Sequence, residues 1–147
     1  MLTRRKVESG AALGQRALLV VAIVSASIGA VSTQARPYNV IMKDVAATSG
    51  ALRKSVEASD FAASAEHAQR LERLFKETED FWTKFKTKDA IDAAVGAKEL
   101  SGSIAAAASA KDAPKMKTAV SGLGRFCTTC HDSHREQMPD KSYRIRP

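Results

Sequence analysis

Apolar residues recur along this chain at alternating intervals of three and four positions, which is the repeat of one face of an α-helix. Four such stretches follow one another from residue 38 onward, separated by short joins at residues 58–60, 86–89 and 110–113. The expected inward-facing positions are Ile41, Val45, Thr48, Leu52 and Val56 in the first helix; Phe61, Ala65, Ala68, Leu71, Phe75, Thr78, Trp82 and Phe85 in the second; Ile91, Val95, Leu100, Ile104 and Ala108 in the third; and Met116, Val120, Leu123, Cys127 and Cys130 in the fourth.

The joins carry residues that start helices. Asp60 precedes the second stretch and Asp112 the fourth, where Pro114 follows in the first turn. Because the joins are short and the stripes alternate three and four, we expect an all-α, antiparallel up-down-up-down four-helix bundle. Large apolar residues are few, so a prosthetic group inside the bundle would supply part of the buried surface. Gly122 and Gly124 would let a flat group approach the fourth helix, or are merely tolerated there.

The first 35 residues have the layout of a secretory signal peptide. Basic side chains precede an uncharged apolar run at residues 17–31, and small residues lead up to Ala35. The run is shorter than the roughly 20 residues that span a bilayer. We therefore expect export and cleavage after Ala35, with an uncleaved anchor as the alternative. Cleavage leaves a bundle domain at residues 36–138, a basic, loosely ordered tail at residues 139–147, and no stable membrane span.

The net charge of the chain limits the kinds of molecule that it is expected to bind. The chain has 147 residues and a formal net charge of +7. Removing residues 1–35 takes away four basic and one acidic side chain, which leaves a net charge of +4. This mild excess suits docking to an acidic protein, but it lacks the concentrated basic stripe of a nucleic-acid binder. The chain has only two cysteines, and both lie in one tetrapeptide, so a disulfide framework is excluded.

The two cysteines lie in the segment Cys127-Thr128-Thr129-Cys130-His131, which has the spacing of a c-type haem attachment motif. On a helix, residues three and four apart share a face, so both thiols can add to the two vinyl groups of one haem. His131 would then reach the iron as its proximal axial ligand. Export supports this interpretation, because c-type haem is assembled outside the bacterial cytoplasm. We expect one covalent haem c, attached to the C-terminal helix.

Three other interpretations of the cysteine pair are open. A thioredoxin-like redox pair needs a strand–helix–strand context, and no strand can be recognised in the sequence. A zinc site would draw Cys127, Cys130, His131 and His134 from eight residues of one helix, whereas structural zinc usually closes a longer loop. An inert or disulfide-linked pair is the third alternative.

A second axial ligand has to come from the other face of the haem. Met138 follows the motif closely and Met116 precedes it on the same helix, so both are expected to remain on the proximal side. Met42 lies on the first helix, which can flank the opposite face, and it is the candidate distal iron ligand. The alternative is that Met42 is a packing residue, since methionine fills irregular gaps well.

A haem motif near the C-terminus of a four-helix bundle resembles the class II c-type cytochromes, which comprise cytochrome c′ and its low-spin relatives. Residues 41–52 (IMKDVAATSGAL) are similar to that family's first helix, with Met42 at its distal haem position. Residues 99–136 resemble its third-to-fourth helix stretch, and the segment GRFCTTCHDSHRE is similar to its attachment segment. His134 and Arg135 occupy the places of an aromatic and a basic residue there.

The resemblance implies a low-spin iron ligated by His131 and Met42, and hence electron transfer rather than enzymatic catalysis. The alternative within the same fold is a five-coordinate haem that binds NO or CO. We therefore expect a periplasmic monohaem electron carrier that docks redox partner proteins, either as a monomer or as a homodimer. That family often has Arg-Gln shortly before the distal residue, where this chain has Tyr38-Asn39. Arg135, one helical turn after His131, is a candidate contact to a haem propionate.

The positions of several residues outside the motif can also be predicted. His134 is expected to pack near the haem edge, and Trp82 and Phe85 are expected to line the core. Three lysines alternate with other residues in the segment 84–88. This run of lysines is typical of a solvated helix end. The alternative is that the lysines form a docking patch for an acidic partner.

Overall fold

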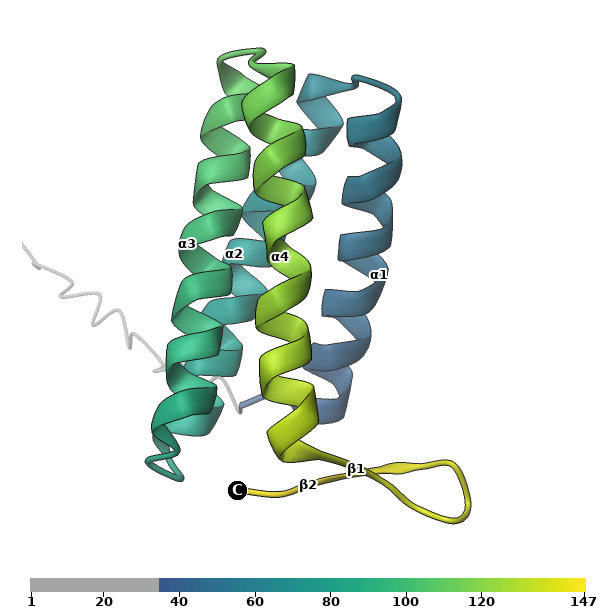
Figure 1. The fold of residues 1–147 in the computed structure, drawn as a ribbon, viewed down its shortest axis with the longest axis vertical. Coiled ribbons are helices and arrows are strands. Elements are labelled where there is room, and N and C mark those ends of the chain that lie inside the picture. Colours follow the sequence, from purple (N-terminus) through teal and green to yellow (C-terminus); the bar gives the residue numbers. More distant parts are fainter. Residues whose placement is uncertain (1–34) are drawn as a thin grey trace, which may run out of the picture. The chain divides into compact units, whose positions relative to one another are not determined.

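The structure is a computed structural model of the protein, and it describes residues 35–147. The predicted signal peptide, residues 1–35, lies outside the described residues except for Ala35. Four α-helices follow one another, which confirms the prediction of an all-α, four-helix architecture (Figure 1). Their bounds are α1 Tyr38–Glu57, α2 Phe61–Thr83, α3 Lys88–Ser109 and α4 Ala113–His134.

The extent of contact differs from one pair of helices to the next. α2 packs most extensively against α3, followed by α3 against α4 and α1 against α2, whereas α1 and α4 contact each other only sparsely. Figure 1 shows the α1–α2 and α3–α4 connectors at one end of the bundle and the α2–α3 connector at the other. The start of α1 and the end of α4 also lie at this second end, which we name the motif end because it carries residues 127–131.

Each connector turns the chain through one residue in the left-handed region. These residues are Ser59, Lys86 and Lys111, with φ of 56°, 57° and 56°. A left-handed residue stops the preceding helix and lets its last carbonyl groups find partners. The carboxylates of Asp60 and Asp112 then each accept a hydrogen bond of 3.0 Å from a backbone N–H three residues on. Both predicted helix caps are confirmed.

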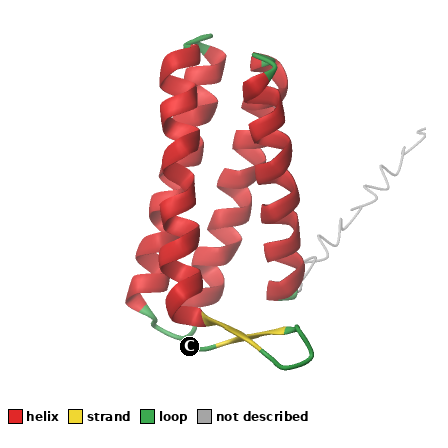
Figure 2. Cartoon of the chain, turned by 45° about the vertical axis from the view of Figure 1, so that its right-hand side comes forward, coloured by secondary structure: helices red, strands yellow, loops and turns green. Residues whose placement is uncertain are grey.

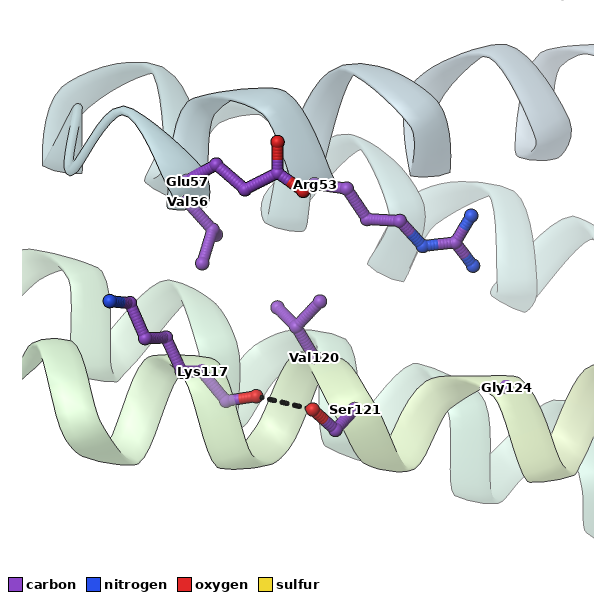
Figure 3. A pocket seen from close by; sticks show the side chains of 7 residues that line it. All are labelled: Arg53, Val56, Glu57, Lys117, Val120, Ser121 and Gly124. Atoms are coloured by element: carbon purple, nitrogen blue, oxygen red, sulfur yellow. Dashed lines mark hydrogen bonds between the residues drawn. The ribbon is translucent and has the colours of Figure 1, made fainter.

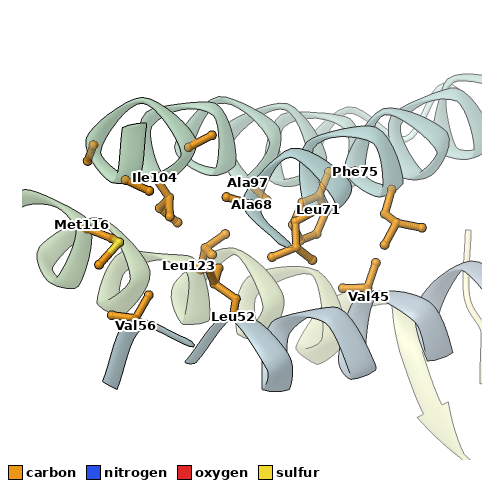
Figure 4. Packing of buried hydrophobic residues seen from close by; sticks show 14 of the residues in the cluster. Val45, Leu52, Val56, Ala68, Leu71, Phe75, Ala97, Ile104, Met116 and Leu123 are labelled. Carbon is orange, nitrogen blue, oxygen red and sulfur yellow. The ribbon is translucent and has the colours of Figure 1, made fainter. Parts of the chain in front are cut away.

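The hydrophobic core runs along the bundle between all four helices (Figure 4). All five positions predicted for α1 are buried. In α3 the prediction is partly wrong, because Ile91, Val95 and Leu100 are only half-buried. The buried face of α3 is made mainly of small residues: Ala90, Ala93, Ala94, Ala97, Ser101, Ile104, Ala105, Ala107 and Ala108. Small side chains allow the backbones of two packed helices to approach closely, and α3 packs most extensively against α2.

The end of α2 separates two aromatic residues that we expected together in the core. Trp82 is 1% exposed, which confirms its prediction, but Phe85 is 48% exposed, so its prediction is wrong. α2 ends at Thr83, and the helical repeat therefore no longer decides where the side chain of Phe85 lies.

The chain after α4 forms a small antiparallel β-hairpin, and the prediction of a loosely ordered tail is wrong (Figure 2). β1 Arg135–Gln137 pairs with β2 Tyr143–Ile145. The backbone N–H of Arg146 donates a hydrogen bond of 2.9 Å to the carbonyl oxygen of His134, which holds the end of the hairpin to α4. Among residues 35–147, no helix combines the length and the apolar character needed to cross a membrane.

Candidate functional site

The cysteine pair and its histidine lie near the end of α4. Cys127, Cys130 and His131 are all half-buried. The Sγ atom of Cys127 lies 3.5 Å from the carbonyl oxygen of Leu123, one turn earlier in the helix. Both cysteines are free thiols. The helix therefore presents two thiols and one imidazole within little more than one turn, as the sequence spacing predicted.

Burial raises the pKa of both thiols. For Cys127, the guanidinium of Arg53 lowers the pKa, but by less than burial raises it. For Cys130, burial together with the charges of Asp89 and Cys127 raises the pKa to about 11. Cysteines that exchange disulfides instead have a lowered pKa, because the thiolate is the nucleophile. These surroundings keep the two sulfurs protonated and do not favour thiol–disulfide exchange.

Burial has the opposite effect on the protonation of His131. It lowers the pKa of the imidazole, and the nearby Arg135 lowers it further, while Asp132 acts against both. The neutral ring is therefore favoured at neutral pH. Metal ions bind the neutral imidazole, since a proton and a metal compete for the same nitrogen. His131 is thus in the state that an iron ligand requires.

A groove lies between α1 and α4, where these helices contact each other only sparsely (Figure 3). Its volume is about 560 Å³. Figure 3 shows two valine side chains pointing toward each other across it. The lining residues are Arg53, Val56 and Glu57 from α1, and Lys117, Val120, Ser121 and Gly124 from α4.

The groove extends along α4 as far as Gly124, one turn before Cys127. A Cβ atom built on Gly124 meets no atom within 4 Å, whereas one built on Gly122 lies 3.1 Å from Leu100. Only Gly124 therefore borders free space, one turn before Cys127. The donor set fits haem c, because Cys127 and Cys130 can form the two thioether bonds and the neutral imidazole of His131 can bind the iron.

Met42, the candidate distal ligand, lies in the second turn of α1. It is half-buried and packs against the hydrophobic core. It comes from the helix that forms one wall of the groove, while His131 belongs to the helix that forms the other. The structure thus places the two predicted axial ligands on the two helices that border the groove. The packing role of Met42 is shown directly, and its role as a ligand stays a prediction.

Arg135 caps α4 one turn beyond His131, as expected, because its backbone N–H donates a hydrogen bond to the carbonyl oxygen of His131, but its side chain turns toward the hairpin. α4 ends at His134, and Arg135 begins β1 with an extended backbone. Its guanidinium carbon lies 4.6 Å from the centre of the Tyr143 ring, which is a cation–π contact. Its charge nevertheless acts on the His131 imidazole by lowering its pKa. A propionate contact from Arg135 would therefore have to come from the hairpin.

The zinc alternative needs four side chains of this segment to converge. Within residues 35–147, no three His, Cys, Asp or Glu side chains come together as a metal-binding group. The side chains of the proposed zinc set are therefore not assembled.

An aromatic cluster that the sequence analysis missed lies at the motif end. The rings of Tyr38 and Phe81 stack with 4.1 Å between their centres, and the indole N–H of Trp82 donates a hydrogen bond of 2.9 Å to the Tyr38 hydroxyl oxygen. The ring of Phe85 lies 5.1 Å from that of Phe81, and the ring of His134 lies 4.9 Å from that of Trp82. The bonded pair is 44 residues apart in sequence, so no local pattern could have revealed it.

This cluster reaches the cysteine motif at two points. Burial raises the pKa of the Tyr38 hydroxyl to about 12, and the Cys130 thiol contributes to the rise, so the two groups lie within electrostatic range. The ring nitrogens of His134 are hydrogen-bonded to Asp89 at 2.9 Å and to the carbonyl oxygen of Arg146 at 2.7 Å. Both nitrogens of His134 therefore have protein partners, and the ring packs against an aromatic side chain.

The site as a whole consists of two protonated thiols and a neutral imidazole near the end of α4, close to an aromatic cluster and beginning one turn beyond Gly124, which lines the groove. The functional interpretation depends on these side chains themselves. No known family, no curated protein and no solved structure matches this chain.

Proposed function

We propose that this protein is a periplasmic c-type cytochrome that carries one covalent haem c and transfers electrons. The observation that carries the proposal is the position of Cys127, Cys130 and His131 within little more than one turn of α4, beginning one turn beyond Gly124, which lines the α1–α4 groove. When bound, haem supplies one-electron exchange between Fe(II) and Fe(III). The basic and apolar segments before Ala35 support export, which brings the chain to the compartment where such haem is attached.

The two cysteines hold the cofactor. Each thiol would add across one vinyl group of the haem, with its proton going to the neighbouring carbon, so attachment would consume no oxidant. The raised pKa values of both thiols favour this protonated starting form over disulfide exchange. Cys127 and Cys130, which share one face of α4, would hold the haem to this helix.

His131 and Met42 complete the proposed ligand set. The lowered pKa of the His131 imidazole leaves its ring nitrogen free to bind iron at neutral pH. Met42 comes from α1, the helix on the other side of the groove from α4, and a thioether ligand from it would favour Fe(II) and raise the reduction potential. A filled sixth position supports electron transfer rather than binding of NO or CO.

The bundle provides the low-dielectric surroundings that set the potential. The short connectors and the position of their ends in Figure 1 support up-down-up-down connectivity, which makes α1 and α4 neighbours in space. A flat cofactor between them would bury apolar surface that the sparse α1–α4 contact leaves open.

The test is production of the full chain in a bacterium that has a c-type haem maturation system. Intact-protein mass spectrometry should show the processed chain plus one haem, and the absorption spectrum should change reversibly on reduction and reoxidation. The double variant Cys127→Ser/Cys130→Ser should carry no covalent haem. The matched control Thr128→Ala/Thr129→Ala alters the exposed residues between the cysteines and should carry haem normally. A wild-type chain with only its polypeptide mass would contradict the proposal.

A further inference from the structure

The motif end carries every large apolar side chain that is exposed within residues 35–147. Val40 is 38% exposed, Phe85 is 48% exposed and Tyr143 is 57% exposed. They belong to the first turn of α1, the α2–α3 connector and β2, which Figure 1 places at the same end of the bundle. Isolated exposed apolar residues are common, but a concentration of them at one end marks a surface that contacts something else.

The α2–α3 connector adds positive charge around Phe85. Lys84 and Lys86 flank it directly, both are exposed, and neither has a carboxylate within 4.0 Å in the described part of the chain. The neighbouring acids already have cationic or imidazole partners: Asp80 with Lys76, Asp89 with His134, and Asp92 with Lys88. The uncompensated charge of the connector is therefore positive.

The connector holds this arrangement in a fixed turn. The backbone N–H of Phe85 donates a hydrogen bond of 3.0 Å to the carbonyl oxygen of Trp82, and that of Lys86 donates one of 3.2 Å to Thr83. Lys86 adopts φ of 57°, which reverses the chain. A surface that is already ordered loses little conformational entropy on binding.

Phe85 is also the outermost ring of the aromatic cluster. Its ring centre lies 5.1 Å from Phe81 and 6.2 Å from Trp82, and both of these rings contact Tyr38. Tyr38 in turn lies within electrostatic range of Cys130. Packed aromatic side chains therefore lead from Phe85, through Phe81 and Trp82 to Tyr38, toward the attachment motif.

We propose that Phe85, Lys84 and Lys86 form the docking surface for a redox protein with an acidic contact face. The inference rests on the proposed function, because it assumes an electron to be exchanged at the motif end. An exposed aromatic ring between two uncompensated cations fits an apolar spot surrounded by carboxylates. Electron-transfer encounters have small interfaces and are steered by charge.

The first experiment measures local charge with two inorganic oxidants of opposite sign. The reduced haem protein, with its haem first verified by mass, is mixed in stopped flow with anionic hexacyanoferrate(III) or with cationic tris(phenanthroline)cobalt(III). Lys84→Glu/Lys86→Glu should slow the anionic oxidant at least about fivefold at low ionic strength and should accelerate the cationic one.

The matched control is Lys111→Glu/Lys115→Glu, which makes the same change of charge at the other end of the bundle. α4 has 22 residues and is therefore about 33 Å long, several times the Debye length of ~10 Å at 0.1 M salt. The control should change either rate by less than about twofold at that salt concentration. Equal effects of the two double variants would overturn the inference and leave the proposed function intact, whereas a chain without haem would refute the function itself.

The second experiment tests the apolar contact with an acidic blue-copper protein as the electron acceptor. Phe85→Ser should slow this reaction while leaving the rate with hexacyanoferrate(III) unchanged, and the control Tyr143→Ser should affect it less. An unchanged rate for Phe85→Ser overturns the docking surface. Two further results would also overturn it: wild-type protein that binds anionic lipid vesicles, or wild-type protein that forms a dimer, if the Lys84→Glu/Lys86→Glu variant loses that property. Either result would show that these residues contact a membrane or a second copy of the chain instead of a redox protein.

Discussion

The indole N–H of Trp82 donates a hydrogen bond of 2.9 Å to the hydroxyl oxygen of Tyr38. The bond joins the last turn of α2 to the first residue of α1, at the motif end of the bundle. Trp82 is 1% exposed, so water cannot replace this acceptor. Burial raises the pKa of Tyr38 to about 12, which keeps the hydroxyl neutral across the physiological range.

Replacing Tyr38 by Phe should therefore destabilise the protein by about 1–3 kcal/mol, because the indole N–H is left buried without an acceptor. Urea unfolding followed by tryptophan fluorescence would measure the loss. Tyr143→Phe removes a hydroxyl from an exposed tyrosine and should be nearly neutral. Equal stability of the two variants would show that the Trp82 bond contributes nothing.

Two helical glycines should respond to alanine with opposite signs. A Cβ on Gly96 would lie 2.3 Å from Cε1 of Phe126, so Gly96→Ala forces the ring to move and should cost about 1–3 kcal/mol. A Cβ on Gly50 meets nothing within 4 Å, and Gly50→Ala should stabilise α1 by about 0.5–1 kcal/mol. Thermal or urea unfolding of both variants checks the sign. A stabilising Gly96→Ala would mean that α3 and α4 are not packed as described.

The Asp89–His134 contact predicts a specific dependence of stability on pH. The hydrogen bond from His134 is the main cause that lowers the pKa of Asp89 below 3.8. A carboxyl with a lowered pKa in the folded state stabilises the fold above its unfolded pKa, and this contribution is lost as pH falls through the folded value. Asp89→Asn should therefore be less stable than the wild type at neutral pH, and the difference should shrink below about pH 4.

Asp92→Asn is the control for this titration. It removes the same charge from the same helix but leaves His134 and its partners untouched. Its loss of stability should be smaller at neutral pH. If the difference in stability between Asp89→Asn and the wild type stays constant from pH 7 to pH 3, the carboxylate is not the source of the effect.

In the haem-loaded protein, Met42→Leu should keep the covalent haem and open the sixth iron position. The volume of the side chain is nearly conserved, so the fold should persist, while the loss of the thioether converts a low-spin iron to a high-spin, CO-binding one. Absorption spectra in both redox states, with and without CO, provide the measurement. Met116→Leu alters a fully buried methionine of α4 and should leave the spectrum unchanged. A wild type that is itself high-spin and binds CO would favour gas binding instead.

The elements of this fold follow from local patterns wherever large apolar residues decide the packing. The stripe from Ile41 to Val56 is buried as predicted, and the caps at Asp60 and Asp112 begin their helices. The pattern fails in α3, where the alanines are buried and Ile91 is only half-buried. Hydrophobicity alone ranked these positions wrongly, because close approach of two helices favours small side chains.

The candidate site divides in the same way between local and tertiary information. The spacing of Cys127, Cys130 and His131 is local, so the sequence was enough to find them. The groove beside Gly124 and the bond between Trp82 and Tyr38 join segments far apart in the chain, and no periodicity encodes them. The two strands of the hairpin after α4 have only three paired residues each, which is too short to produce a recognisable strand pattern in the sequence.

Because α1 contacts α4 only sparsely, α1 is the helix that can swing away at the smallest cost in packing. The other three helices then form a platform on which the attachment segment is already displayed. If the protein carries haem c as proposed, an enzyme that joins porphyrin to sulfur would reach both thiols in that order of assembly before the first helix docks. The last step of folding and the last step of maturation would then be the same movement.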